Sequence, residues 1–164
     1  MNICRSFPPV IAADSKVLIL GSMPGKKSLA MQQYYAHPQN RFWKLMAALF
    51  EEKQPVEYSD KLALLRKNRV ALWDVLDYCE REGSLDSDIR NEQPNDIPDL
   101  LQNYPQLEAV FCNGGKAGRA LKKYFAASLK IPVYYLHSTS PANARMNLAA
   151  LQEEWQQLKI WTEK

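Results

Sequence analysis

The stretch Val17-Leu18-Ile19-Leu20-Gly21-Ser22-Met23-Pro24-Gly25 decides the fold of this chain. Its first four residues are aliphatic and a glycine ends the run, which is typical of a short buried strand that leads into a loop. Three more runs of this kind lie at residues 70–75, 107–112 and 133–136. The sequence therefore predicts four buried strands.

Helical patterns alternate with these runs. Apolar residues recur at intervals of three and four over residues 42–50. Leu62 and Leu65 share a helical face after Ser59, which is a suitable N-cap. Two more helical stretches follow, at residues 115–125 and 148–158. Strands that alternate with helices predict an α/β fold whose parallel sheet is covered on both faces.

Length and composition limit the class of protein to which this chain can belong. With 164 residues and 46% hydrophobic content, the chain is expected to form one domain, residues 1–164, around a single core. The 21 Lys and Arg against 18 Asp and Glu give a formal charge of +3, too small to indicate a polyanionic partner by itself. No apolar stretch reaches the roughly 18 residues that suggest a membrane span, so no membrane partner is expected.

The cysteines bear on the compartment and on metal binding. Cys4, Cys79 and Cys112 are odd in number, widely separated and outside any C-x-x-C pairing. They therefore indicate neither a disulfide framework nor a zinc or iron–sulfur site. A reducing cytoplasm is the expected location.

The loops after the predicted strands carry the polar residues of most interest. Parallel sheets bind ligands beyond the carboxyl ends of their strands. Residues 21–25, Asp74, Asn113 and residues 137–143 would all emerge at that edge. We therefore expect one site, built from loops that are distant in sequence.

Four motifs carry a family resemblance. They are Gly21-Ser22-Met23-Pro24-Gly25, His37-Pro38-Gln39-Asn40-Arg41-Phe42-Trp43, Leu72-Trp73-Asp74-Val75 and His137-Ser138-Thr139-Ser140-Pro141-Ala142-Asn143. In this order they resemble the uracil-DNA glycosylase superfamily, and within it the hypoxanthine-DNA glycosylase branch. The resemblance implies a three-layer α/β/α sandwich with a central four-stranded parallel sheet, and cleavage of the bond between a damaged base and deoxyribose.

The implied reaction needs no metal and no cofactor. Such an enzyme swings the nucleotide out of the duplex into a pocket, and a poorly paired deaminated base costs least to extrude. Cleavage builds positive charge on the sugar and negative charge on the base, so fixed hydrogen-bond donors near the base stabilise the transition state. Water, rather than a lysine, is the expected nucleophile.

Three residues are predicted to be catalytic. Asn40 positions the water, because the branch that the chain resembles uses the asparagine of a His-Pro-x-Asn motif. Ser22 stands where related branches place Asn or Asp, so it is a poor base whose hydroxyl still suits contact with base or water. His137 donates to the leaving base. Asn40 also precedes an amphipathic helix, so helix capping is the competing explanation.

The extruded base is expected to meet the loop Met23-Pro24-Gly25 and an aromatic face from Tyr35 or Phe42. Phe42 also lies on the apolar helical stripe, which favours burial. Asp74 ends the second predicted strand, where the superfamily often presents an asparagine. An ionised carboxylate only accepts hydrogen bonds, which suits the N1–H of hypoxanthine or the N3–H of uracil. A turn or cap formed by Asp74 is the alternative.

DNA contacts are expected around this site. Lysine side chains, hydroxyls and backbone amides suit phosphate oxygens, and small polar side chains suit the space that a flipped nucleotide leaves. The predicted contacts are Lys26, Asn113, Lys116, Ser138, Ser140, Asn143 and Arg145. Solvent exposure of the lysines and ordinary use of residues 113–116 in a strand-to-helix turn are the alternatives.

Two other classes of protein fit parts of the sequence. Residues 21–28 resemble a phosphate-binding P-loop, but only three residues separate the glycines, and Pro24 removes an amide that the phosphate cradle needs. A non-catalytic DNA-binding module of the same fold would explain Ser22 and Asp74. The sequence favours a monomeric, monofunctional glycosylase that removes hypoxanthine from DNA, with a mismatch-type uracil or thymine glycosylase as the alternative.

Overall fold

The four predicted strands form one parallel sheet. In a computed structural model, which describes residues 2–164, they are β2 (Val17–Gly21), β3 (Val70–Asp74), β6 (Ala109–Asn113) and β7 (Val133–Leu136). Their order across the sheet is β3-β2-β6-β7, and every neighbouring pair is parallel. The prediction is confirmed, with strand ends within two residues of those expected.

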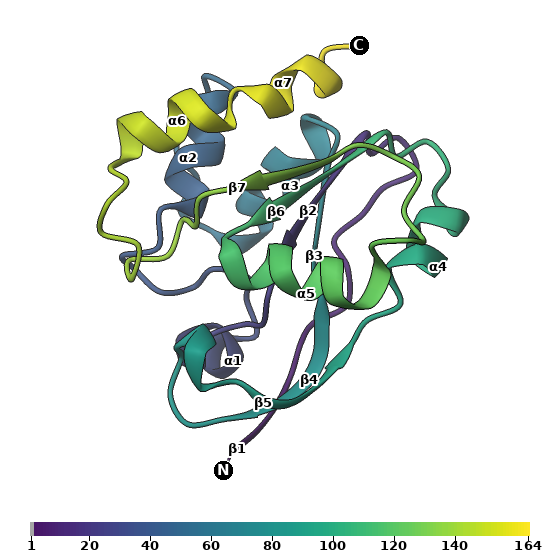
Figure 1. The fold of residues 1–164 in the computed structure, drawn as a ribbon. Helices are drawn as coiled ribbons and strands as arrows, with labels where there is room; N and C mark the ends of the chain where they lie inside the picture. Colours follow the sequence, from purple (N-terminus) through teal and green to yellow (C-terminus); the bar gives the residue numbers. More distant parts are fainter. Residues whose placement is uncertain (1) are drawn as a thin grey trace.

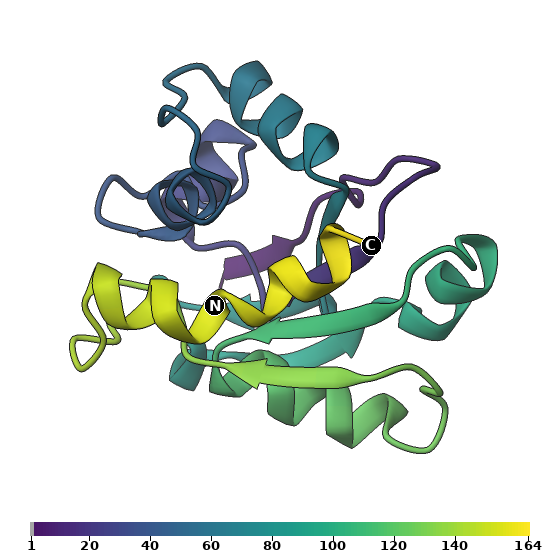
Figure 2. The same ribbon diagram turned by 90° about the horizontal axis from the view of Figure 1, so that it is seen from above.

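Alternate residues of the central strand β2 enter two different cores. Val17 and Ile19 lie in one core and Leu18 and Leu20 in the other, and all four are fully buried. The first core is covered by α2 (Phe42–Leu49), α3 (Tyr58–Lys67), α6 (Leu148–Trp155) and α7 (Gln157–Thr162). The second is covered by α4 (Ile97–Asn103) and α5 (Gly115–Phe125). Figures 1 and 2 show α5 and α6 on opposite sides of the sheet, which confirms the three-layer α/β/α sandwich.

A second, antiparallel sheet was not predicted. It contains β1 (Asn2–Arg5), β4 (Leu76–Arg81) and β5 (Arg90–Pro94) in the order β1-β4-β5, and it forms the lower part of Figure 1. β4 follows β3 after a single residue. The sequence of β5, Arg-Asn-Glu-Gln-Pro, contains no aliphatic or aromatic residue and therefore gives no strand signal. The connection between β4 and β5, here named the 82–89 loop, returns to the carboxyl edge of the parallel sheet and includes the 3-10 turn η1 (Asp86–Asp88).

Two helix predictions were wrong in detail. α3 begins at Tyr58 after Glu57, so Ser59 lies inside the first turn instead of at the N-cap. The Tyr58 hydroxyl accepts a hydrogen bond from the Tyr34 backbone N–H, and the helix begins two residues earlier than expected. The expected C-terminal helix is divided at Gln156 into α6 and α7. A short helix, α1 (Lys26–Met31), follows the first loop.

Within residues 2–164, no helix combines the length and the apolar character that crossing a bilayer requires.

Candidate active site

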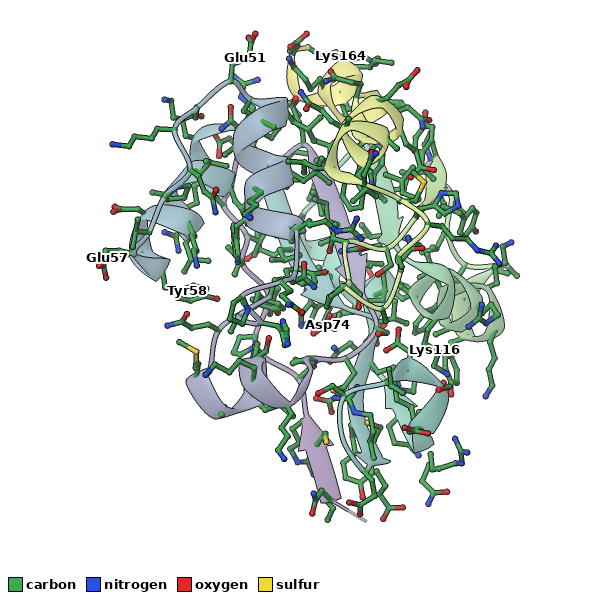
Figure 3. The ribbon with its side chains drawn as sticks, turned by 90° about the vertical axis from the view of Figure 1, so that its left-hand side faces the viewer. Glu51, Glu57, Tyr58, Asp74, Lys116 and Lys164 are labelled. Carbon is green, nitrogen blue, oxygen red and sulfur yellow. The ribbon has the colours of Figure 1, made fainter. Side chains whose placement is uncertain are left out.

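A cavity of about 830 Å³ opens at the carboxyl edge of the parallel sheet. The loops after β2 and β7 and the ends of β3 and β6 line it, as the sequence predicts, and so does the 82–89 loop. Figure 3 faces this side of the molecule, with Asp74 near the middle of the view and Lys116 to its right. Asn40 and His137 line the same cavity although they are far apart in sequence.

Asn40 lies one residue before the N-cap of α2, Arg41, and lines the cavity. Its Oδ1 accepts hydrogen bonds from the Phe42 backbone N–H and the Thr139 hydroxyl, each at 2.9 Å. Because a backbone N–H only donates, the atom that faces Phe42 must be the amide oxygen. The capping explanation is therefore correct only in that Asn40 binds the first N–H of α2, because the N-cap position itself belongs to Arg41. This arrangement leaves the Asn40 Nδ2 as the donor group that the residue can offer to a ligand or a water.

Asn113 extends this network from the end of β6. Its Oδ1 accepts from the Thr139 backbone N–H at 3.0 Å, and its Nδ2 donates to the Thr139 and Tyr35 hydroxyls, each at 3.1 Å. Only 8% of Asn113 is exposed. Its side chain is thus committed to internal hydrogen bonds, which gives the predicted phosphate contact no support. Thr139, which joins Asn40 to Asn113, was not predicted.

Tyr35 and Phe42 form a stacked pair. Their ring centroids lie 4.2 Å apart, with 22° between the ring planes. Tyr35 has a left-handed backbone conformation (φ 53°) and lines the cavity, whereas Phe42 is fully buried on the apolar stripe of α2 and is not a wall of the cavity. Phe42 therefore supports the ring of Tyr35 from behind, and the direct base contact predicted for Phe42 does not fit its position.

Asp74 ends β3 as a buried carboxyl at the cavity wall, 3% exposed. A Cβ on Gly21 would lie 2.5 Å from the Asp74 Oδ1 and 2.8 Å from the Tyr35 hydroxyl oxygen, so only glycine leaves room for these two groups. The Oδ2 has no hydrogen-bond partner among residues 2–164. Burial, together with the nearby Asp86 and against the opposing effect of Arg81, raises the pKa of Asp74 to about 8. Asp74 is therefore largely protonated at neutral pH and can donate as well as accept, which the sequence did not predict.

The 82–89 loop holds the loop after β2. The Ser22 hydroxyl donates to the Asp86 Oδ1 at 2.7 Å, and the Lys26 backbone N–H donates to the Ser84 hydroxyl at 2.7 Å. The buried Arg81 guanidinium donates to the carbonyl oxygens of Pro24 and Ser84. Met23, Pro24 and Gly25 line the cavity as expected. No sequence motif indicated this support, because it comes from a polar loop more than 50 residues away.

His137 follows β7 at the rim of the cavity. Its Nδ1 lies 2.6 Å from the Glu154 Oε2, and its backbone N–H donates to the Glu154 Oε1 at 2.7 Å. The side chain of His137 is 60% exposed. Glu154 therefore fixes the orientation of the ring and leaves Nε2 as the nitrogen that it does not engage. The catalytic role of His137 stays a prediction.

Arg41 orders the loop that follows β7. Its guanidinium donates to the carbonyl oxygens of Ser140 and Asn143, each at 3.0 Å, and to that of Met146. Its backbone N–H donates to the Thr139 carbonyl at 3.1 Å. Four carbonyl groups of one loop thus converge on a single residue, so the loop has a defined shape without DNA. Arg41 belongs to the second of the four sequence motifs, but the sequence did not predict a role for it.

The hydroxyls of this loop make local hydrogen bonds. The Ser138 oxygen accepts from the Ser140 backbone N–H at 3.0 Å, and the Ser140 oxygen accepts from the Ala142 backbone N–H at 3.1 Å. The Asn143 Nδ2 donates to the Ser138 carbonyl at 3.1 Å. Arg145 is exposed. The predicted DNA contacts of these residues stay predictions.

Basic side chains surround part of the cavity. Lys26 is exposed at its rim, whereas Lys116 forms an ion pair with Glu92, whose other oxygen accepts from the Tyr124 hydroxyl at 2.9 Å. Lys116 is therefore partly neutralised, which weakens its predicted phosphate contact. Arg119 and Lys122 also line the cavity and were missed. Lys116, Arg119 and Lys122 follow one another at intervals of three residues along α5, and this spacing was the available signal.

Fold and cavity together define the class of protein. The molecule is an α/β/α protein whose ligand site is assembled from loops at the carboxyl edge of a parallel sheet. The sequence profile of the uracil DNA glycosylase superfamily matches residues 8–163. The chain belongs to this superfamily.

Individual relatives cover nearly the whole chain. A protein of Methanosarcina acetivorans named hypoxanthine DNA glycosylase is 40% identical over 155 residues, which is 93% of this chain and 95% of the relative. A protein of the same name from Methanosarcina barkeri is 37% identical over 152 residues, 92% of this chain and 94% of that one. The solution NMR structure of a Methanosarcina acetivorans protein, provisionally described as a uracil DNA glycosylase, matches with a TM-score of 0.83 and 37% identity over 99% of this chain and 100% of its own.

Proposed function

We propose that this protein is a monofunctional DNA glycosylase that hydrolyses the N-glycosidic bond of deaminated nucleotides, foremost deoxyinosine, in base-excision repair. Membership of the superfamily and the two relatives named for hypoxanthine support this assignment. The observation that carries it is the convergence of Tyr35, Asp74 and Asn40 on one cavity of about 830 Å³, which is large enough for a purine.

The cavity offers a flipped base an aromatic face and polar groups at its edge. Tyr35, supported by Phe42, stacks on the base. Asp74 lines the cavity, and its buried Oδ2 has no partner among residues 2–164; because burial keeps the carboxyl largely protonated, Asp74 can donate a hydrogen bond to a ring carbonyl of a base that enters. A donor at this position stabilises the negative charge that develops on the departing base.

Water attacks the sugar on the side of the cavity where Asn40 lies. Since the Asn40 Oδ1 is occupied by Phe42 and Thr139, its Nδ2 holds the water through the water oxygen and leaves a lone pair for attack. As the bond from the sugar C1′ to the base nitrogen breaks and the water oxygen bonds to C1′, the proton that the water loses neutralises the departing base anion. His137, oriented by Glu154, adds a second donor at the rim. No step requires a metal ion or an organic cofactor.

The duplex is bound along the basic rim and the loop ordered by Arg41. Lys26, Arg119 and Lys122 supply positive charge for phosphates, and residues 138–145 fill the space that the flipped nucleotide leaves. All these groups come from one chain, so the protein is expected to act as a monomer. Its three cysteines are unpaired and buried, which supports a reducing cytoplasm as its location.

The test is a base-release assay. Purified protein is incubated, in the presence of a chelator, with duplexes that carry hypoxanthine, uracil, xanthine or a G:T mismatch, and abasic sites are revealed by alkaline cleavage. We expect the fastest release from the hypoxanthine duplex and no covalent complex after borohydride treatment. Tight binding without base release would support a non-catalytic module, and a trapped complex would contradict attack by water.

A further inference from the structure

The Ser22 hydroxyl has a fixed polarity. A hydroxyl carries one hydrogen and two lone pairs. The hydrogen of Ser22 is donated to the Asp86 Oδ1 at 2.7 Å. Within residues 2–164 no group donates a hydrogen bond to the Ser22 oxygen, and this residue, 9% exposed, lines the cavity. Ser22 therefore presents lone pairs, and no hydrogen, to whatever enters.

Asp86, which also lines the cavity, can impose this polarity because the turn that it begins holds it in place. It begins the 3-10 turn of the 82–89 loop, and the Asp88 backbone N–H donates to the Leu85 carbonyl at 3.1 Å to close that turn. The loop is further tied to the segment after Ser22 through Arg81 and Ser84. Without the Asp86 carboxylate, the Ser22 hydroxyl would be free to rotate and to donate into the cavity.

We propose that Asp86 is a specificity-determining residue, because it makes Ser22 an obligate acceptor for a ring N–H of the bound base. The inference rests on the proposed function and deepens it. Deamination of adenine converts ring nitrogen N1 from an acceptor into an N–H donor and replaces the amino group by a carbonyl. An acceptor fixed at Ser22 accepts a hydrogen bond from the N1–H of hypoxanthine. The N1 of adenine carries a lone pair and no hydrogen, so it forms no hydrogen bond with this acceptor.

Asp74 completes the pattern. It lies at the end of the strand next to β2, and its buried Oδ2 lacks a partner among residues 2–164. A protonated carboxyl there donates to a carbonyl oxygen while Ser22 accepts from the adjacent N–H. This donor and acceptor pair matches the –NH–C(=O)– edge shared by hypoxanthine, xanthine and uracil. Normal adenine carries the reversed pattern, so two lone pairs meet at N1 and a site built for N–H rejects it.

The test compares two bases in single-turnover reactions. Duplexes carry either hypoxanthine or unsubstituted purine, whose N1 has no hydrogen, and the ratio of the two release rates is measured for the wild-type protein, Asp86→Ala and Ser22→Ala. We expect the ratio to fall about tenfold in each variant, the loss of one discriminating hydrogen bond. The double variant should show little further loss, since both residues act through one hydrogen bond. General damage to the fold lowers both rates together and leaves the ratio unchanged.

Asp88→Ala is the matched control, because it removes the same charge from the same 3-10 turn at a residue that does not line the cavity. Its ratio should equal that of the wild-type protein. An unchanged ratio in a folded, active Asp86→Ala or Ser22→Ala variant overturns the inference and leaves the proposed function standing. Failure of the wild-type protein to release hypoxanthine overturns the proposed function, and the inference with it.

Discussion

Two walls of the cavity differ in how completely their polar atoms are hydrogen-bonded. In the wall formed by Asn40, Asn113 and Thr139, the amide oxygens and the hydroxyl are all engaged with one another or with the backbone. In the wall formed by Ser22 and Asp74, a buried carboxyl oxygen has no partner among residues 2–164, and the serine oxygen receives no hydrogen bond. Apart from the Asn40 Nδ2, which stays available to a ligand or a water, the polar side-chain atoms of the first wall are already hydrogen-bonded, whereas in the second wall the Asp74 Oδ2 is not.

The difference shows where a ligand supplies missing contacts. Leaving a buried polar atom unpaired costs about 1–3 kcal/mol, so such atoms persist where a bound molecule satisfies them. In the reaction that we propose, the satisfied wall fixes the position of groups that act on the sugar and the water, whereas the unsatisfied wall recognises the base. The four predictions below test this division, from the largest expected effect to the smallest.

Gly21→Ala should damage the unsatisfied wall most. The new Cβ would lie 2.5 Å from the Asp74 Oδ1 and 2.8 Å from the Tyr35 hydroxyl oxygen, and both groups are held by surrounding structure. We expect release of hypoxanthine to slow by more than about 100-fold, because displacement by about 1 Å is enough for such a loss. Single-turnover rates measure it. Gly115→Ala is the control, since its Cβ would meet only the movable end of Arg119; equal losses in both variants would contradict the prediction.

Asn40→Ala removes the group that the satisfied wall offers to water. We expect turnover to fall about 100-fold or more, while the affinity for duplex DNA changes little. The readouts are the single-turnover rate and the dissociation constant from fluorescence anisotropy, with thermal unfolding measured in parallel. A lower unfolding temperature with nearly normal turnover would mean that Asn40 only caps α2.

Thr139→Val tests the hydrogen bonds inside the satisfied wall. Valine has nearly the same shape as threonine, but it leaves the Asn40 Oδ1 and the Asn113 Nδ2 with one partner fewer. We expect the free energy of unfolding to fall by about 1–3 kcal/mol, together with a slower turnover. Urea unfolding measures the first quantity. Thr162→Val in α7, whose hydroxyl makes only a 3.4 Å bond to the Lys159 carbonyl, is the control and should change stability much less.

Asp74→Asn should change how stability depends on pH. The pKa of Asp74 is about 8 in the folded protein and near its ordinary value in the unfolded chain, so the unfolded chain loses this proton first as pH rises. The wild-type free energy of unfolding therefore falls between about pH 4 and pH 8, by at most about 1.4 kcal/mol per pH unit from this group. The variant lacks this contribution, as urea unfolding from pH 5 to pH 9 would show. Asp77→Asn, at a half-exposed aspartate, should keep the wild-type slope, and parallel slopes for all three proteins would contradict the prediction.

The sequence predicts the parallel sheet well because its strands are short aliphatic runs. It also predicts which loops form the cavity, since the carboxyl ends of parallel strands must share an edge. The antiparallel sheet escaped prediction because β5 is polar throughout and is held as a strand only by pairing with β4. Hydrophobic periodicity carries no information about such a strand.

The sequence predicted which residues line the cavity better than it predicted their hydrogen-bond partners. Asn40, Tyr35 and Asp74 line the cavity, as predicted. The sequence did not reveal that the Asp74 carboxyl is largely protonated or that the Asn113 side chain is hydrogen-bonded to Thr139. These properties depend on burial and on contacts across the fold. Asp86 could not be found in advance, because its only signal is a hydrogen bond to a serine 64 residues away.

Arg41 can order the loop after β7 only when most of the chain has folded. It lies 105 residues from Met146 and 102 from Asn143, so its guanidinium meets those carbonyls only after β6 and β7 have joined the sheet. Contacts at such separation form slowly, because a long segment must lose its freedom before they can stabilise anything. In refolding experiments, helical circular dichroism should therefore return before the ability to release a base.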